Sequence, residues 1–327
     1  MTKLSHIQIQ QLLPLHMIYV ILLSEAIFVK YYAPDYYGRF KCIADKCKHS
    51  CCIGWEIDVD EDTLALYDTI GGEIGERLQK NICRDGDCAH FVLGGEERCP
   101  FLNDRNLCDI ILELGDGALC DICADHPRYR SFYKDRTEEG LGMSCEEAAR
   151  IILTNPFKVK IVLTEDDGER AEADPKEEWF LNLRDKIIAM LQKRELPVDM
   201  RLMGVVSALG IDLPSLSPDA LYGLYISLER LDEEWTAYLD RLRETELTKD
   251  PDLEVPYEQL LVYLVYRNLK AEDIVGTMKF CLISYLVICH ISEVMGGSME
   301  ALQDVCRRYS AEIEYSDENI GRIINVL

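Results

Sequence analysis

The chain has 327 residues, of which 48% are hydrophobic, so it is long enough to bury one large core or two ordinary ones. Its formal charge is −24, from 59 acidic and 35 basic residues. Nucleic acids and anionic membranes attract basic proteins, so this balance argues against both as partners. The protein is therefore expected to act on a neutral or locally basic partner.

The N-terminal residues 1–27 are expected to form an extension to the main body of the protein. Residues 12–29 are an apolar run interrupted by Pro14, His16 and Glu25. A glutamate inside the run disfavours a membrane span, and no small-residue cleavage site follows it. We therefore expect neither a membrane anchor nor a signal peptide.

Cysteines are concentrated in the segment from residue 40 to residue 145, so the chemistry of the protein is expected there. Eleven of the fourteen cysteines lie in it: Cys42, Cys47, Cys51, Cys52, Cys83, Cys88, Cys99, Cys108, Cys120, Cys123 and Cys145. The other three, Cys281, Cys289 and Cys306, lie in apolar helical patterns and are predicted to be core residues. Closely spaced thiols of this kind indicate a metal site in a reducing compartment rather than disulfides.

Two kinds of metal centre fit these spacings. A structural zinc site uses two pairs of ligands, which Cys47 with Cys51 and Cys120 with Cys123 supply. Iron–sulfur clusters use cysteine loops of similar length, and the thiols outnumber the needs of one zinc ion. The three-cysteine motif of radical S-adenosylmethionine enzymes is incomplete, because Gly54 occupies its third position. Thiol redox chemistry at the Cys120 and Cys123 pair is a further alternative.

Residues beside the cysteines have structural interpretations as well as functional ones. His126 is either a metal ligand or a turn residue with a satisfied hydrogen bond. Arg128 and Arg130 either pair with acidic residues, which is the favoured interpretation, or bind a carboxylate substrate. Trp55 is expected to shield the metal site. A glycine-rich nucleotide-binding loop is missing, which argues against a Rossmann-type enzyme.

Hydrophobic periodicity predicts a mainly α protein with an irregular, cysteine-rich, metal-binding N-terminal half and an all-helical C-terminal half. Domain boundaries are expected at 28–155 for the metal or iron–sulfur domain and at 156–327 for the helical domain. One helix is predicted to start within 60–67, with Asp60 as its cap. Further helices are predicted at 146–153, 179–191, 221–242, 257–269, 274–294 and 299–309. Short strands are predicted at 57–60 and 157–163, an irregular segment at 71–95 and an acidic linker at 165–178.

Several blocks of sequence together resemble a known family. FKCIADKCKHSCCIGWEIDVD, CPFL, LCDICADHPR and SCEEAARIIL, with the later YEQLLVYLVYR and KFCLISYLVICHI, resemble the flagellin lysine N-methylases, whose cysteine region is also described as a zinc- or iron-chelating domain. The similarity extends over residues 28–327. Residues 1–26 have no counterpart in that family, so Met17 is an alternative start.

This resemblance implies a cytoplasmic enzyme that carries an iron–sulfur cluster, a 4Fe-4S cluster rather than zinc. It would transfer methyl groups from S-adenosylmethionine to lysines of flagellin. The metal ligands that the resemblance implies are Cys42, Cys47, Cys51, Cys52, Cys99, Cys108, Cys120, Cys123 and Cys145. Glu146 departs from the proline expected after Cys145, and Cys83 and Cys88 lie outside the matching blocks.

Lysine methylation requires a free amine, whereas lysine with a pKa near 10.4 is mostly protonated at neutral pH. Candidate groups that could assist deprotonation are Asp58, Asp60, Tyr67 and Tyr129. The cofactor pocket and the catalytic residues are not identified by the sequence. A non-catalytic protein that stores, senses or delivers iron or zinc is the alternative function.

Overall fold

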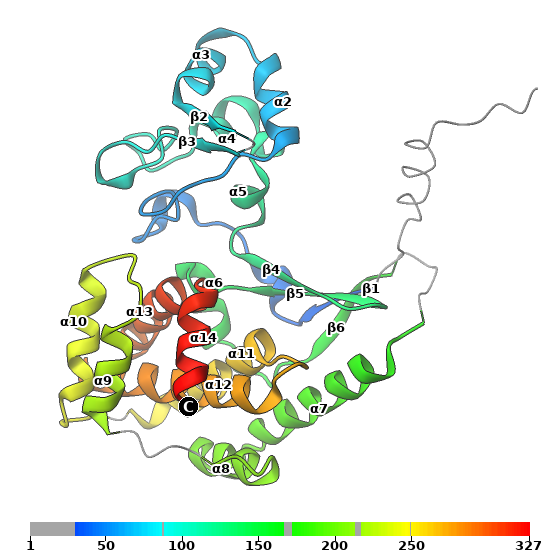
Figure 1. Cartoon of the computed structure of the whole chain (residues 1–327), viewed down its shortest axis with the longest axis vertical. Coiled ribbons are helices and arrows are strands. Elements are labelled where there is room, and N and C mark those ends of the chain that lie inside the picture. Colours follow the sequence, from blue (N-terminus) through cyan, green and yellow to red (C-terminus); the bar gives the residue numbers. More distant parts are fainter. Residues whose placement is uncertain (1–29, 87, 167–171, 213–216, 249) are drawn as a thin grey trace, which may run out of the picture.

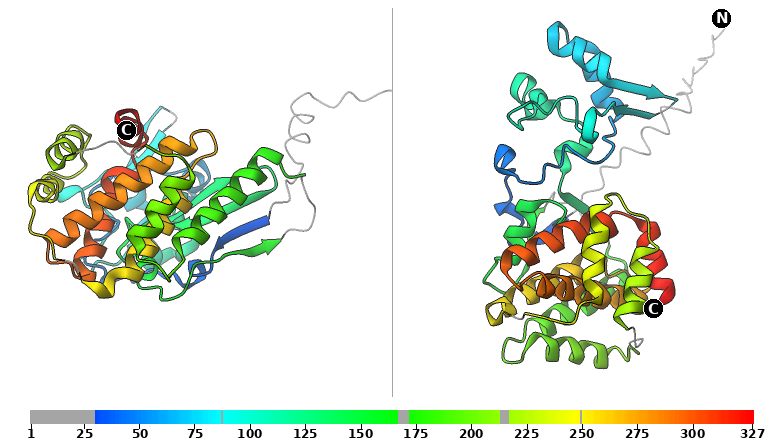
Figure 2. Two further views of the ribbon diagram at one scale, coloured as in Figure 1. Left: turned by 90° about the horizontal axis from the view of Figure 1, so that it is seen from below. Right: turned by 90° about the vertical axis from the view of Figure 1, so that its left-hand side faces the viewer.

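The computed structural model describes residues 30–86, 88–166, 172–212, 217–248 and 250–327 (Figure 1). The expected N-terminal extension at residues 1–27 lies outside these ranges. Within them the protein is mainly α, as predicted, but it also contains two β-sheets. The cysteine-rich elements lie at one end of the molecule and helices α7 and α8 at the other, with strand β4 between them (Figures 1 and 2).

A four-stranded mixed sheet connects the two ends of the molecule. Its strand order is β4 (Arg128–Phe132), β5 (Arg136–Leu141), β1 (Lys30–Pro34) and β6 (Ile161–Asp166). Strands β1 and β5 are parallel, with Tyr31 opposite Thr137, and the other two pairs are antiparallel. The predicted strand at 157–163 is therefore shifted to β6. The prediction of an all-helical second half is wrong in this respect, because β6 pairs with β1.

The cysteine-rich part is less irregular than predicted. It contains α2 (Glu61–Thr69), α3 (Gly72–Asn81), the hairpin of β2 (Ile82–Asp85) and β3 (Cys88–Phe91), and the short helices α4 (Asp109–Leu114) and α5 (Asp121–Asp125). The predicted start of α2 is confirmed, because the Asp60 side chain accepts the Thr63 N–H at its N-terminus. The prediction of an irregular 71–95 segment is wrong, and 57–60 forms an isolated bridge through Asp58 rather than a strand.

The helical part contains most of the long helices. They are α6 (Glu146–Leu153), α7 (Pro175–Leu191), α8 (Val198–Ala208), α9 (Pro218–Ile226), α10 (Glu234–Asp240), α11 (Glu254–Asn268), α12 (Ile274–Val294), α13 (Met299–Tyr309) and α14 (Asp317–Val326). The predicted helix at 221–242 is two helices, α9 and α10. Helix α7 begins inside the stretch predicted to be a linker, with Pro175 at its first position.

Helix α12 is long and apolar enough to span a membrane, and no other helix in the described ranges is. Most of this helix is buried: 67% of its most apolar window lies inside the protein. It packs against α11 and α13. This packing confirms the prediction of a buried helix, and it places Cys281 and Cys289 in the core.

Two hydrophobic cores are present, one large and one small. The large core contains residues of α7, α11, α12 and α13 together with Leu141, Met143 and buried residues of α6, so it includes residues before and after position 155. The small core lies in the cysteine-rich part and includes Tyr67, Phe91 and Phe101. Cys99 and Cys120 are buried members of the small core.

A buried ion pair joins the sheet to α7. The Arg184 guanidinium donates two hydrogen bonds to the carboxylate of Glu138 on β5, and both side chains are nearly inaccessible to solvent. Arg184 also lies over the ring of Tyr266, with its guanidinium carbon 4.9 Å from the ring centroid. Removing one member would leave a buried charge without compensation, which is strongly destabilising.

We therefore expect Glu138→Ala to lower the free energy of unfolding by about 3–5 kcal/mol, because Arg184 would lose its only buried carboxylate partner within the described residues. The exposed pair between Arg243 and Asp219 provides the control, and Asp219→Ala should cost about 1 kcal/mol or less. Urea denaturation of the two variants measures the difference. Equal losses of stability would contradict this account of the sheet and α7.

Candidate functional site

The first cysteines lie on an irregular loop, as the sequence predicts. Between residues 41 and 55 the helical structure is limited to one 3-10 turn, Ala44–Lys46. Ala44 has a φ of 50°, a left-handed conformation that is uncommon for residues with a side chain. Local preferences alone therefore do not account for the path of this loop.

Glu146 holds the loop against the start of α6. Its Oε2 atom accepts the backbone N–H groups of Lys48 at 2.9 Å and His49 at 3.2 Å, and it lies 3.2 Å from Nδ1 of His49. It is also 3.8 Å from Sγ of Cys47. Because Cys145 immediately precedes α6, the same contacts keep the Cys47 segment beside Cys145. Glu146, which departs from the expected proline, thus has a clear structural role.

Four cysteines form an outer thiol group at this place: Cys42, Cys47, Cys51 and Cys145. The pKa of Cys47 is raised to about 11, mainly by burial, with smaller contributions from the nearby Glu146, Cys145 and Cys42 side chains. The pKa of the Cys51 thiol is also raised, mainly by a hydrogen bond with Cys52 and by burial, with additional contributions from Cys145 and Cys42. These mutual effects identify the four side chains as electrostatic neighbours.

Five other cysteines form an inner thiol group in the small core: Cys52, Cys99, Cys108, Cys120 and Cys123. The Cys99 N–H donates to the Cys52 carbonyl at 2.9 Å, which joins two segments of this group. The pKa of Cys99 is raised to about 12, mainly by burial, and the Cys52 and Cys108 thiols add to the shift. A hydrogen bond from Cys123 lowers the pKa of Cys120. The nine predicted ligands therefore occupy two neighbourhoods, which meet at Cys51 and Cys52.

The donor chemistry of both groups fits a thiophilic metal, because thiolates favour zinc, copper(I) and iron–sulfur clusters. In the described ranges, however, no three Cys, His, Asp or Glu side chains lie close enough together to hold a metal ion. The assignment of these nine cysteines as metal ligands therefore remains a prediction.

The remaining cysteines are separate from the two groups. Cys83 and Cys88 belong to the hairpin of β2 and β3. Cys281, Cys289 and Cys306 are buried in α12 and α13, as predicted.

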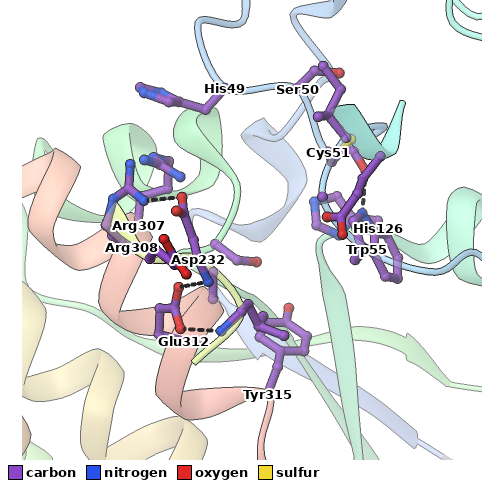
Figure 3. Close-up of a pocket in the computed structure, with 17 residues that line it drawn as sticks. His49, Ser50, Cys51, Trp55, His126, Asp232, Arg307, Arg308, Glu312 and Tyr315 are labelled. Atoms are coloured by element: carbon purple, nitrogen blue, oxygen red, sulfur yellow. Dashed lines mark hydrogen bonds and ion pairs between the residues drawn. The ribbon is translucent and has the colours of Figure 1, made fainter. Parts of the chain in front are cut away.

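A cavity of about 480 Å³ lies beside the outer thiol group (Figure 3). One wall comes from the cysteine-rich part and includes Cys51, Trp55 and His126. The opposite wall comes from the helical part, including the segment 231–233 before α10 and residues within 307–312. Its volume lies within the range of about 300–1,000 Å³ that is usual for small-molecule sites.

The helical wall carries a fixed arrangement of charges. The Glu312 carboxylate accepts the backbone N–H groups of Leu231 at 2.8 Å and Asp232 at 3.0 Å, which positions the 231–233 segment. Burial raises the pKa of Glu312. Arg308 pairs with Asp232 at 2.6 Å and with Glu234 at 2.8 Å. Glu312 belongs to a π-helix, Ser310–Glu314, a form of backbone that is frequent at functional sites.

Tyr315 follows the π-helix and lines the cavity between the two walls (Figure 3). The buried Arg267 guanidinium lies between the rings of Tyr315 and Tyr129, at 4.8 Å and 4.5 Å from their centroids. A Cβ atom on Gly142 would lie 2.5 Å from Oη of Tyr315 and 3.1 Å from Nη1 of Arg267. Glycine at position 142 therefore permits the close approach of these side chains to the segment that leads to Cys145.

His126 and Trp55 lie together on the other wall, with ring centroids 6.1 Å apart. Burial lowers the pKa of His126 to about 4, so its imidazole is neutral at pH 7. Its Nε2 atom is buried and has no hydrogen-bond partner among the described residues. The Trp55 indole N–H donates to the Cys51 carbonyl.

The four residues suggested by the sequence to assist deprotonation of the substrate lysine do not line the cavity. Asp60 caps α2 and also accepts the Asp121 N–H, and Tyr67 donates to the Ala118 carbonyl. Tyr129 is packed on Arg267, and Asp58 belongs to an isolated bridge. Sequence reasoning missed Asp232, Glu233, Glu312 and Tyr315, which nothing in the sequence connects with the cysteine segment.

The two arginines beside His126 have separate structural partners. Arg130 pairs with Asp125 at 2.6 Å and Glu139 at 3.2 Å, as predicted. Arg128 instead lies over the rings of Tyr37 and Phe40 and has no ion pair among the described residues, so its predicted pairing with an acidic residue is wrong.

Fold and site together define a mainly α protein with a cysteine-rich part and a cavity between that part and its helices. Among proteins of known name, the chain is 30% identical over 132 residues to the flagellar biosynthetic protein FliU of Salmonella muenchen, covering 38% of this chain and 76% of FliU. It is 29% and 28% identical over 162 residues to the lysine-N-methylases of Salmonella typhimurium and Salmonella choleraesuis, covering 46% of this chain and 40% of each enzyme. The chain belongs to the family that contains FliU and these lysine-N-methylases.

The match covers only part of the methylases, since the chain spans about two fifths of their length. No protein-family profile matches the chain, and no solved structure does.

The contacts of Glu146 predict its effect on the cysteine loop. Glu146→Ala should increase the alkylation rate of Cys47 several-fold in metal-free protein, because the loop loses its anchor and the thiol loses a neighbouring negative charge. Glu146→Gln keeps a hydrogen-bond acceptor and should produce a smaller increase. Peptide mass spectrometry after timed alkylation measures both rates.

Glu300→Ala is the matched control, because Glu300 pairs only with the exposed Nζ of Lys48 in the described residues. An equal effect of Glu300→Ala and Glu146→Ala would contradict the anchoring role of Glu146.

Proposed function

We propose that this chain is a protein-lysine N-methyltransferase that acts on flagellin with S-adenosylmethionine as the methyl donor. One structural observation carries the proposal: a cavity of ligand size lies between the outer thiol group and an acidic helical wall, in a chain whose relatives include lysine-N-methylases. FliU, named as a flagellar biosynthetic protein, supports flagellin as the protein substrate. A cytoplasmic location agrees with such a substrate.

A metal centre forms part of this proposal. We assign the outer group of Cys42, Cys47, Cys51 and Cys145 to a 4Fe-4S cluster, because this group adjoins the cavity through Cys51. The inner group supplies further thiol ligands in the small core. When held by three of these four thiols, the cluster would supply an open iron site able to ligate the amino and carboxylate groups of S-adenosylmethionine.

The residues of this chain would then prepare the lysine amine for reaction. The amine nitrogen forms a bond to the methyl carbon as the carbon–sulfur bond breaks, which leaves S-adenosylhomocysteine and releases one proton from nitrogen. His126 lines the cavity as a neutral imidazole, and its Nε2 atom, which has no partner in the described residues, would accept an N–H of the amine and orient its lone pair.

The alternative function is non-catalytic binding of iron or zinc. It is favoured by the inner thiol group, whose five cysteines pack in the small core and do not line the cavity. Such a centre would stabilise the cysteine-rich part without taking part in a reaction.

Metal analysis of protein purified without oxygen tests the proposal. We expect about four irons and four acid-labile sulfides per cluster. Cys145→Ser should remove most iron of the outer group, whereas Cys83→Ser, which alters a thiol outside both groups, should retain it. Stoichiometric zinc without sulfide would instead support the alternative function.

Two assays then examine the reaction itself. Flagellin incubated with labelled S-adenosylmethionine should acquire label in lysines, and His126→Ala should reduce the initial rate by about tenfold or more. S-adenosylmethionine should bind more weakly to cluster-free protein than to reconstituted protein. Equal affinity would refute a direct role of the cluster in binding the methyl donor.

A further inference from the structure

We infer that the acidic and aromatic cavity beside Cys51 is the binding pocket for the substrate lysine side chain, which it selects by positive charge. The pocket consists of Trp55, Tyr315, Asp232 and Glu233 on the two walls described above. This inference rests on the proposed function for the identity of the substrate. The argument for a cationic ligand comes from the charges and rings of the cavity.

The charges of the lining leave an excess of carboxylates. Arg308 is paired with two acidic residues, and Arg307 is paired with Asp304 at 3.2 Å. By contrast, Glu97 and Glu233 line the cavity with no ion pair in the part of the chain that the structure describes. A cation entering the cavity therefore meets unneutralised negative charge, whereas an anion is repelled.

Aromatic rings complete a site suited to an alkylammonium group. Trp55 belongs to one wall, and Tyr315 lies between the walls (Figure 3). The faces of tryptophan and tyrosine rings attract ammonium groups, including methylated lysines. Since Arg267 lies over the Tyr315 ring, it also limits the movement of this residue.

The backbone around the carboxylates is held in place before any ligand binds. Glu312 accepts two N–H groups of the 231–233 segment, and Arg308 holds the Asp232 side chain. A prearranged segment loses less conformational entropy when a ligand binds. The cavity volume of about 480 Å³ exceeds the need of one lysine side chain, which leaves room for the sulfonium end of the methyl donor. Both ligands are cations, so the acidic lining favours both.

The test measures binding of small lysine analogues to the purified full chain with its metal. The probes are Nα-acetyl-lysine N-methylamide, its Nε-trimethyl derivative and the uncharged norleucine counterpart, titrated in an NMR experiment. We expect both cationic probes to bind about tenfold or more tightly than norleucine. Glu233→Gln and Tyr315→Leu should each weaken binding of the lysine probe about threefold to tenfold.

Conservative and distant variants provide the controls. Tyr315→Phe keeps the aromatic ring and should bind the lysine probe like the wild type. Glu229→Gln removes an exposed carboxylate of the same chain region that does not line the cavity, and it should also leave binding unchanged. Equal affinity for lysine and norleucine, or unchanged binding in both Glu233→Gln and Tyr315→Leu, would overturn the pocket assignment.

Methyl transfer to flagellin separates this inference from the proposed function. Selective lysine binding that is lost in Glu233→Gln, without any methyl transfer by the wild type, would support the pocket and refute the enzyme. Methyl transfer by the wild type with an unchanged KM for flagellin in Glu233→Gln and Tyr315→Leu would refute the pocket and leave the enzyme intact.

Discussion

The cysteine-rich part depends on a buried polar connection to the helical part. The Glu314 carboxylate accepts the Tyr263 hydroxyl at 2.6 Å, and the oxygen of that hydroxyl accepts the Met143 N–H at 3.2 Å. Met143 lies on the segment between β5 and α6, two residues before Cys145. Because these groups are buried, each must keep its hydrogen-bond partner. This requirement fixes the position of Cys145 relative to α11 and the π-helix, and Glu146 extends the connection to the Cys47 loop.

Sequence periodicity located the elements that are formed by local interactions. Helices α12 and α13 begin and end as predicted, because Asp273 and Ser298 cap their first turns and continuous apolar faces follow. The mixed sheet was not predicted, since β1 pairs with β5 more than 100 residues later in the chain. Such pairing depends on tertiary packing rather than on any pattern within β1 itself.

The candidate site could also be predicted from the sequence only in part. Clustered cysteines identified the metal-binding candidates, because thiol density is a property of one segment of sequence. Their division into outer and inner groups depends on tertiary packing. Cys145 lies beside Cys47 because the next residue, Glu146, contacts the Cys47 loop, and Cys99 lies beside Cys52 because their backbones are hydrogen-bonded. The helical wall of the cavity was not predictable, because Asp232 and Tyr315 have no spacing relation to Cys51.

The fold gives the adjacent residues Cys51 and Cys52 different neighbouring thiols. Adjacent thiols are awkward ligands for the same iron, and the sequence does not indicate which of them would bind. In the structure the two thiols interact with each other but have different further neighbours: Cys145 and Cys42 for Cys51, and Cys99 and Cys108 for Cys52. The chain therefore passes from one thiol group to the other within a single peptide unit.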